Sequence, residues 1–198
     1  MRIVSIIAIA VSVVIATSGC APVLKAPIGD EGVEKASDQL DHGYALLYQL
    51  LKDESRVADI LKIKNPYDET AEILVSISET ANKGIKLIEK GVTDKPVLVL
   101  EKSGLPMIET DARNRIANSV TMALVLALGT SFEVQILLSQ EKACGYAAAL
   151  CESLANADPN RDRAEGIGKL GKSFSELGGK VRGRLTIIVP AKDTTSGS

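Results

Sequence analysis

The segment from Gly166 to Ser173 has the spacing of a phosphate-binding loop. It reads Gly-Ile-Gly-Lys-Leu-Gly-Lys-Ser, which matches both the Walker A pattern and the looser G-x-G-x-x-G pattern. In such a loop the backbone N–H groups curl around phosphates, which requires a buried strand before the loop and a helix after it. The preceding residues are mostly polar, and Ile167, Leu170 and Phe174 keep a helical spacing through the segment. The sequence therefore favours a glycine-containing helix over a nucleotide site.

Two cysteines, Cys144 and Cys151, lie seven residues apart in a strongly helical stretch. At 1.5 Å per residue their Cα atoms would be about 10 Å apart, whereas a disulfide needs less than about 7 Å. They are therefore expected to be buried on one helix face as small apolar side chains. An intermolecular disulfide is the alternative. No histidine is close to either thiol in sequence, so a thiol nucleophile is not indicated.

The single histidine, His42, follows Asp38 by four residues and lies beside Asp41. One turn of helix could bring these side chains together as a weak surface metal site. Asp38 and His42 lie off the apolar stripe of their helix, so a solvated acidic face is the expected arrangement. A di-iron bundle would need paired Glu-x-x-His motifs. The sequence thus predicts no catalytic residue, no metal and no cofactor.

The first 20 residues have the order of parts found in an export signal. Arg2 supplies a positive start, residues 3–16 are apolar apart from two serines, and residues 17–19 are small. The apolar part is short for a membrane-spanning helix, which needs about 20 residues. Cys20 follows the small residues directly.

This segment resembles the bacterial lipoprotein signal family, whose signals end in an invariant cysteine. The resemblance covers residues 1–20 and departs from the common form at Thr17, where the family prefers leucine. It implies that residues 1–19 are a signal peptide and that Cys20 carries a thioether-linked diacylglycerol, which would anchor the exported protein to the cell envelope. Ala21 after the cysteine would suggest the periplasmic face of the outer membrane in a Gram-negative cell. The alternative is ordinary secretion with a chance cysteine.

Composition narrows the possible partners. The predicted signal contains one charged residue, Arg2. Removal of the signal would leave 22 basic and 25 acidic residues. Nucleic-acid binding depends on clustered Lys and Arg, so nucleic acid is not an expected partner. The chain has no Trp, two Phe and four Tyr, so stacking platforms for sugars or bases are scarce.

Apolar spacing predicts an all-α domain at residues 30–189, after a tether at 20–29 and before a disordered tail at 190–198. The first helix is expected from Asp30 to about Lys64, and the second from Pro66 to Gly91. Their apolar stripes, typical of helices buried along one face, read Val33, Ala36, Leu40, Gly43, Leu47, Leu50, Glu54, Val57 and Leu61, then Tyr67, Leu74, Ile77, Ala81, Ile85 and Ile88.

Residues 92–106 are expected to connect to the next helix, either as a short helix or as an extended piece that pairs with residues 185–189. Residues 106–156 could form one helix or two. Gly129 could end a third helix, and residues 130–133 match a capping box that would start a fourth. Val120–Leu128 is apolar on nearly every side and is expected to be the most buried element. The window 116–138 is long enough to span a bilayer, but its polar residues favour a core hairpin.

The last helix is predicted to pack through an apolar stripe and a ridge of small residues. The stripe reads Ile167, Leu170, Phe174, Leu177, Val181 and Leu185, and the ridge reads Gly171, Ser175, Gly179 and Gly183. Residues 161–184 carry seven positive and three negative charges, whereas residues 30–41 carry five negative and one positive. These two helices are expected to pack with complementary charge; the alternative is a last helix lying on anionic lipid.

The sequence thus predicts a four- to five-helix, mostly antiparallel bundle anchored to a membrane through Cys20. The expected function is non-catalytic: a structural, scaffolding or partner-binding lipoprotein of the envelope. The second hypothesis is a module that binds an apolar or lipid ligand between its helices, and an enzyme is the third. A wide internal cavity would favour a ligand, whereas a packed core with an exposed apolar groove would favour a protein partner.

Overall fold

The computed structural model describes residues 30–101 and 104–189, with side chains described from Asp38 onward. The signal, the tether, Cys20 and the tail from residue 190 lie outside the described residues. The described part is all-helical and without strands, which confirms the predicted all-α bundle. Its elements are α1 (Asp30–Glu54), the 3₁₀ helix η1 (Val57–Lys62), α2 (Asp68–Gly91), α3 (Met107–Leu126), α4 (Gly129–Ala157) and α5 (Arg161–Ile188).

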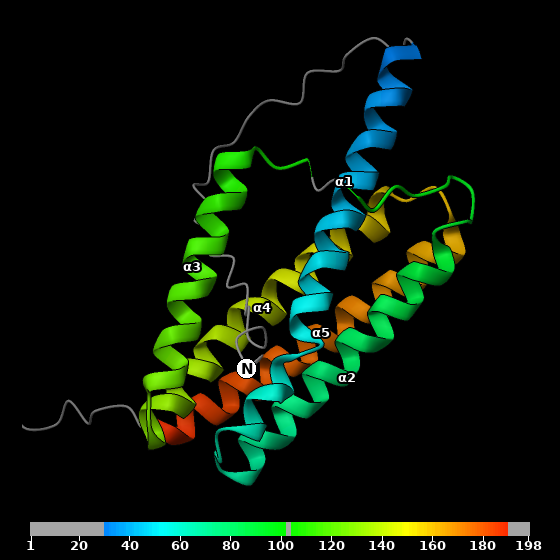
Figure 1. Ribbon diagram of the computed structural model, residues 1–198. Coiled ribbons are helices and arrows are strands. Elements are labelled where there is room, and N and C mark those ends of the chain that lie inside the picture. The colour runs from blue at the N-terminus through cyan, green and yellow to red at the C-terminus, as the bar shows by residue number, and fades with distance from the viewer. Residues whose placement is uncertain (1–29, 102–103, 190–198) are drawn as a thin grey trace, which may run out of the picture.

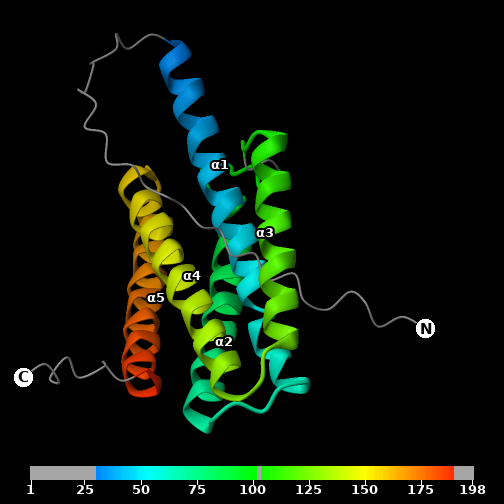
Figure 2. The same cartoon turned by 90° about the vertical axis from the view of Figure 1, so that its left-hand side faces the viewer.

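Four of the helices form a ring, and the fifth lies at its edge. α1 packs against α2 and α4, and α5 packs against the same two helices, so the order around the ring is α1, α2, α5, α4. The colours in Figure 1 show that neighbouring helices of the ring run in opposite directions. In both Figure 1 and Figure 2, α3 lies at the periphery. The core residues are supplied mainly by the ring, among them Tyr44, Leu47, Leu51, Leu74, Ile77, Ile136, Leu137, Ile167 and Phe174.

The first helix is shorter than predicted. α1 ends at Glu54, and a turn at Ser55 leads into η1, where the prediction had a continuous α-helix to about Lys64. In a 3₁₀ helix residues three apart lie on one face, so Val57 and Ile60 are both buried, while Leu61 is only half-buried. The apolar stripe therefore continues into the core with a changed period.

The second helix matches its predicted stripe except at the start. α2 begins at Asp68, and Tyr67 before it is 61 % exposed rather than buried. Leu74, Ile77, Ala81 and Ile88 are buried as predicted, and Ile85 is half-buried.

The third helix is much less buried than predicted. Residues 120–128 were expected to be the most buried element, but α3 buries only Ala117 and Leu124. The segment is apolar, as its sequence shows, but most of its side chains face away from the bundle.

The region 106–156 forms two helices. Ala127 and Leu128 are extended, and Gly129 has φ of +52°, a left-handed conformation that glycine adopts without steric cost. The capping box predicted at residues 130–133 is not formed, because no side chain caps the start of α4. Glu133 instead accepts hydrogen bonds from the backbone N of Tyr67 (2.6 Å) and from Thr70 Oγ1 (2.9 Å). It therefore joins α4 to α2.

The last helix docks through its predicted stripe: Ile167, Leu170, Phe174, Leu177 and Val181 are buried, and Leu185 is half-buried. Its position in the ring is different from the one expected. α5 lies against α2 and α4, and the charge partners of Arg184 and Arg182 are on those helices: Glu69 and Glu133 for Arg184, and Glu141 for Arg182. Residues 185–188 are helical, so they form no strand with the 92–106 connection.

None of the helices in the described part of the chain combines the length and the apolar character needed to cross a membrane.

Candidate functional site

The glycine-rich segment does not form a phosphate-binding loop. Residues 166–173 lie inside the continuous helix α5, as their apolar spacing predicted. Ile167 and Leu170 are buried in the core, while Lys172 is exposed. Because the backbone N–H groups of a helix interior already bond to carbonyls one turn earlier, they do not curl into a cradle for phosphate.

Gly171 of α5 lies where a side chain would collide with Cys151 of α4, whereas the distance at Gly178 is that of an ordinary contact with Cys144. A Cβ atom added to Gly171 would lie 2.8 Å from Cys151 Cβ, and one added to Gly178 would lie 3.5 Å from Cys144 Cβ. The predicted small-residue ridge is thus only partly correct, because an added Cβ at Gly179 or at Gly183 would meet nothing.

The cysteines are free and buried, as predicted. Burial raises the pKa of both Cys144 and Cys151 to about 12. Since the thiolate is the reactive form, these side chains act as small apolar residues that fit against glycines.

Of the three residues considered for a surface metal site, Asp38 is exposed, and Asp41 and His42 have other contacts. Asp41 Oδ1 accepts a hydrogen bond from the backbone N of Val99 (3.1 Å), which fastens the 92–106 connection to α1. The imidazole of His42 lies directly against Gly104, where a Cβ atom would come within 2.3 Å of Nδ1. No group of three His, Cys, Asp or Glu side chains converges in a metal-binding arrangement within the described ranges.

A buried ion pair joins the end of the bundle where α1, α2, α4 and α5 meet. Asp158 and Arg163 have side chains that are 0 % and 1 % exposed, and Arg163 Nε lies 2.5 Å from Asp158 Oδ2. Tyr44 of α1 donates its hydroxyl to the same oxygen (2.6 Å), and its ring lies under the guanidinium at 5.5 Å. Arg163 Nη1 also donates to the backbone carbonyls of Gly91 (3.1 Å), Asp94 (3.2 Å) and Pro96 (2.9 Å).

The pKa shifts in this cluster favour a charged Asp158 and an un-ionised Tyr44, as in a buried ion pair that stabilises the fold. Burial alone would raise the pKa of Asp158, but the hydrogen bonds from Arg163 and Tyr44 outweigh burial and hold it below its usual value. Burial and the adjacent Asp158 raise the pKa of Tyr44. The sequence does not predict this role for the polar turn after α4, because nothing local shows that its charges are buried.

A second buried polar group lies beside the cysteine face of α4. Glu54, at the end of α1, is 1 % exposed, and neither carboxylate oxygen makes a hydrogen bond to the described residues. Gln140 lies nearby, and both of its amide atoms are likewise buried without a bond of good geometry. Burial, helped by the charge of Asp53 and opposed by Gln140, raises the pKa of Glu54 to about 8.

The face of α3 toward the bundle carries four apolar residues, two of them alanines, and one arginine. It is formed by Arg113, Ala117, Val120, Leu124 and Ala127, which alternate four and three positions apart and are buried or half-buried. This spacing is that of a helix packed along one seam.

The opposite face of α3 carries a second stripe with the same spacing, which we call the outer stripe. Its members are Ile108, Ala112, Arg115, Ser119, Met122 and Leu126, and all of them are exposed. Ile108 is 84 %, Met122 59 % and Leu126 73 % exposed. A helix that turns longer apolar side chains to solvent than to its own bundle presents an unpartnered surface. The sequence did indicate the apolar character of α3, but not which face the bundle would leave uncovered.

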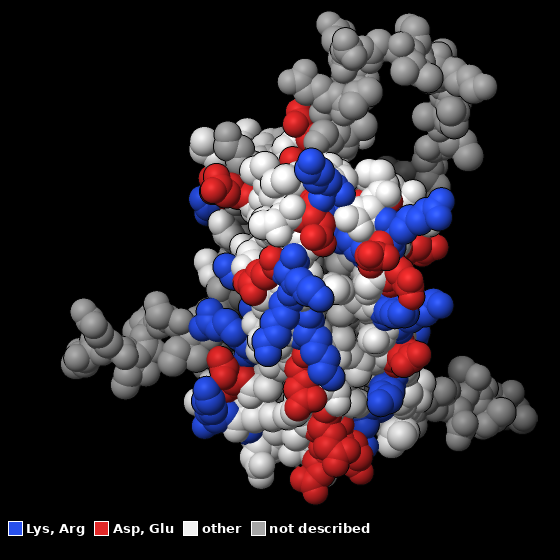
Figure 3. Space-filling model, turned by 90° about the vertical axis from the view of Figure 1, so that its right-hand side faces the viewer, with Lys and Arg blue, Asp and Glu red and all other residues white. Residues whose placement is uncertain are grey.

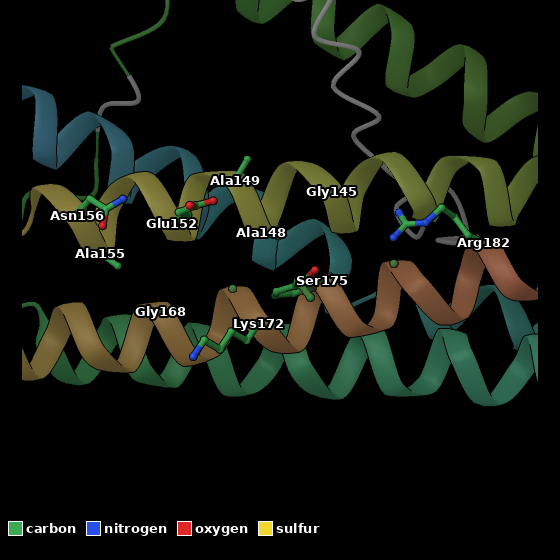
Figure 4. A pocket seen from close by; sticks show the side chains of 13 residues that line it. Gly145, Ala148, Ala149, Glu152, Ala155, Asn156, Gly168, Lys172, Ser175 and Arg182 are labelled. Carbon is green, nitrogen blue, oxygen red and sulfur yellow. The ribbon is translucent and has the colours of Figure 1, made fainter.

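The surface also has grooves, of which the one along α4 and α5 is shown in Figure 4. Its volume is about 610 Å³, and small residues such as Gly145, Ala148 and Gly168 form much of its wall. Glu152, Lys172 and Arg182 line it as well. The apolar side chains of this lining are alanines and the fully buried Phe174, so the groove presents no large exposed apolar side chain to a partner.

Comparison with protein-family models, with curated proteins and with solved structures found no match for this chain.

Proposed function

We propose that this protein is a lipid-anchored, non-catalytic envelope protein that binds a helix of another envelope protein through the outer stripe of α3. The observation that carries the proposal is the exposure of a six-position stripe with four- and three-residue spacing. That spacing is the one by which a helix recognises another helix, with side chains of one inserting between those of its neighbour.

The chemistry of the partner follows from the outer stripe. Arg115 interrupts an otherwise uncharged row, with Ile108 and Ala112 on one side and Met122 and Leu126 on the other. A complementary helix would carry apolar side chains on one face and a carboxylate opposite Arg115, because an uncompensated charge in a covered interface is costly.

A protein partner suits this molecule better than a ligand between the ring helices, which is the second hypothesis. The ring is filled by interlocking side chains such as Leu47, Ile77, Ile136 and Phe174, each 0 % exposed. An apolar ligand of ordinary size needs a cavity of about 300 Å³ or more, and the larger hollows found in the described residues open at the surface.

An anionic lipid surface is a less suitable partner for the described faces. The outer stripe contains one basic residue, whereas helices that lie on such lipid have polar faces rich in Lys and Arg. On the face formed by α2 and α5, basic and acidic side chains are interspersed (Figure 3), as with Lys83 and Lys180 beside Glu79 and Glu176.

A photo-crosslinking residue at Ser119 tests the proposal in intact envelopes. We expect a discrete adduct with a second protein, and we expect Leu126→Lys to reduce its yield at least tenfold. Leu126 is exposed, so the substitution should change the free energy of unfolding by no more than about 0.5 kcal/mol. The readouts are adduct mass and identity, with thermal melting of the purified variant.

The matched control is Val75→Lys on α2, which also places a charge at an exposed apolar position. It should leave the adduct unchanged. An adduct of twice the mass of the chain would mean that the outer stripe pairs two copies, and crosslinking to lipid alone would mean that it contacts the bilayer. Either result contradicts a separate protein partner.

The anchor is tested at Cys20, the residue on which the lipid attachment depends. Cys20→Ser removes the thiol that would form the thioether, so the variant should lose label from a clickable fatty acid and leave the membrane-bound, processed fraction. Two or more acyl chains bind membranes stably because each buried methylene contributes about 0.8 kcal/mol. Equal labelling of the variant and the unaltered protein would refute lipid attachment at Cys20.

A further inference from the structure

A half-enclosed pocket lies between α1, α3 and α4, apart from the outer stripe. Its volume is about 280 Å³, just below the usual range of small-molecule sites, about 300–1,000 Å³, and therefore suited to a small ligand. Four leucines form apolar parts of its wall: Leu46 and Leu50 from α1, and Leu100 and Leu105 from the connection before α3. A small apolar body could therefore leave water by entering this pocket.

Polar groups from three helices meet in the same pocket. α1 contributes Gln49 and Asp53, one turn apart, and α3 contributes Thr110, Arg113 and Asn114 on its facing turn. Tyr146 of α4 completes the lining. Apolar walls with a few convergent polar groups are the usual composition of a ligand site.

The charge balance of the lining is negative. Asp53 and Glu101 supply two carboxylates, and Arg113 supplies the positive charge. The guanidinium of Arg113 is already bound by Glu109, with Nε 2.7 Å from Oε1, and it also interacts with Tyr146. The charge of Arg113 is thus paired with Glu109, which does not line the pocket, so the two carboxylates of the lining set its preference for charge.

Asp53 is the carboxylate placed to receive a ligand. Its side chain is half-buried, and its hydrogen bond from Gln49 Nε2 is long at 3.4 Å. Burial, opposed by Gln49 and by the charge of Arg56, raises the pKa of Asp53 to about 6. A cationic donor beside Asp53 would replace the hydration that the carboxylate loses in this position.

We propose that this pocket binds a small amphiphilic amine, with its ammonium group on Asp53 and its apolar body against the four leucines. The inference is independent of the helix partner proposed above, because none of the outer-stripe residues lines the pocket. A single ammonium on a short alkyl chain fits both the volume and the sign of the charge.

Calorimetric titration of the purified protein with hexylammonium tests the proposal, with hexanol as a neutral probe of similar shape. Hexylammonium is expected to bind saturably and at least tenfold more tightly than hexanol. Asp53→Asn should reduce its affinity at least tenfold, to the level of hexanol. Asp59→Asn, which removes a carboxylate outside the lining, should leave the affinity unchanged.

Amide chemical shifts, measured by NMR in a parallel titration with hexylammonium, locate the ligand. Hexylammonium should move resonances of residues 46–53 and 110–114 and leave those of α5 in place. Absence of saturable binding, equal affinities for the two probes, or full affinity in Asp53→Asn would each overturn the proposal. Because Asp53 is only half-buried, the melting temperature of Asp53→Asn should stay close to that of the unaltered protein. Measuring it shows whether unfolding of the variant, rather than loss of the carboxylate, accounts for lost binding.

Discussion

Arg163→Met is expected to destabilise the bundle by about 3–5 kcal/mol, the usual cost of removing one partner from a buried ion pair. The carboxylate of Asp158 would stay in the core without its cation, and three backbone carbonyls of residues 91–96 would lose their donor. For a chain of this length the melting temperature should fall by on the order of 10 °C. Thermal and denaturant unfolding measure the loss.

The double variant Arg163→Met/Asp158→Leu separates the charge from the packing. Replacing both members of a buried pair by apolar residues is often close to neutral, so the double variant should recover a large part of the lost stability. Arg182→Met is the control, because Arg182 pairs with Glu141 at an exposed position and exposed pairs contribute at most about 1 kcal/mol. If Arg163→Met and Arg182→Met cost the same, the buried pair does not hold the bundle end together.

Raising the pH from about 4.5 to about 8 is expected to lower the free energy of unfolding, through Glu54, by on the order of 5 kcal/mol. The folded protein holds the Glu54 proton up to about pH 8, whereas the unfolded chain releases it near pH 4.5. The native state binds more protons across this window, so the free energy of unfolding falls as pH rises. Each unit of difference in pKa corresponds to about 1.4 kcal/mol.

Glu54→Gln isolates this contribution, because a neutral amide of the same shape does not titrate. We expect the variant to be the more stable protein at pH 8.5 and to approach the unaltered protein below pH 4.5. Urea unfolding at a series of pH values gives the difference curve, with Glu72→Gln on the exposed face of α2 as the control. Parallel curves for Glu54→Gln and the unaltered protein would show that Glu54 is ionised in the fold.

The regular parts of the fold could be predicted from the sequence because helical spacing is a local property. The stripe of α5 and the main part of the α2 stripe lie in the core as predicted. The same reasoning failed where burial depends on distant segments. Residues 120–128 are apolar on nearly every side, and nothing within them indicates that the ring closes through α1, α2, α5 and α4 and leaves α3 outside.

The polar interior was the other feature that local reasoning missed. Glu54 occupies a position of the predicted apolar stripe, and that position alone indicates that its side chain is buried. Asp158 and Arg163 gave no comparable signal. Their burial results from α5 returning along α4 under Tyr44, and the carbonyls that bind Arg163 come from residues more than 60 positions away in sequence.

The two α4 cysteines pack against glycines of α5, so in the native helical domain their thiols should react very slowly with thiol reagents. Of the three cysteines in the chain, Cys144 and Cys151 are buried, with pKa values of about 12. A maleimide that reacts quickly with the folded chain therefore reports on Cys20, and the thioether to diacylglycerol at that sulfur would block the reaction. The number of thiols labelled before and after denaturation then measures lipid processing on the unaltered protein, and an engineered surface cysteine can carry a dye without removal of the native pair.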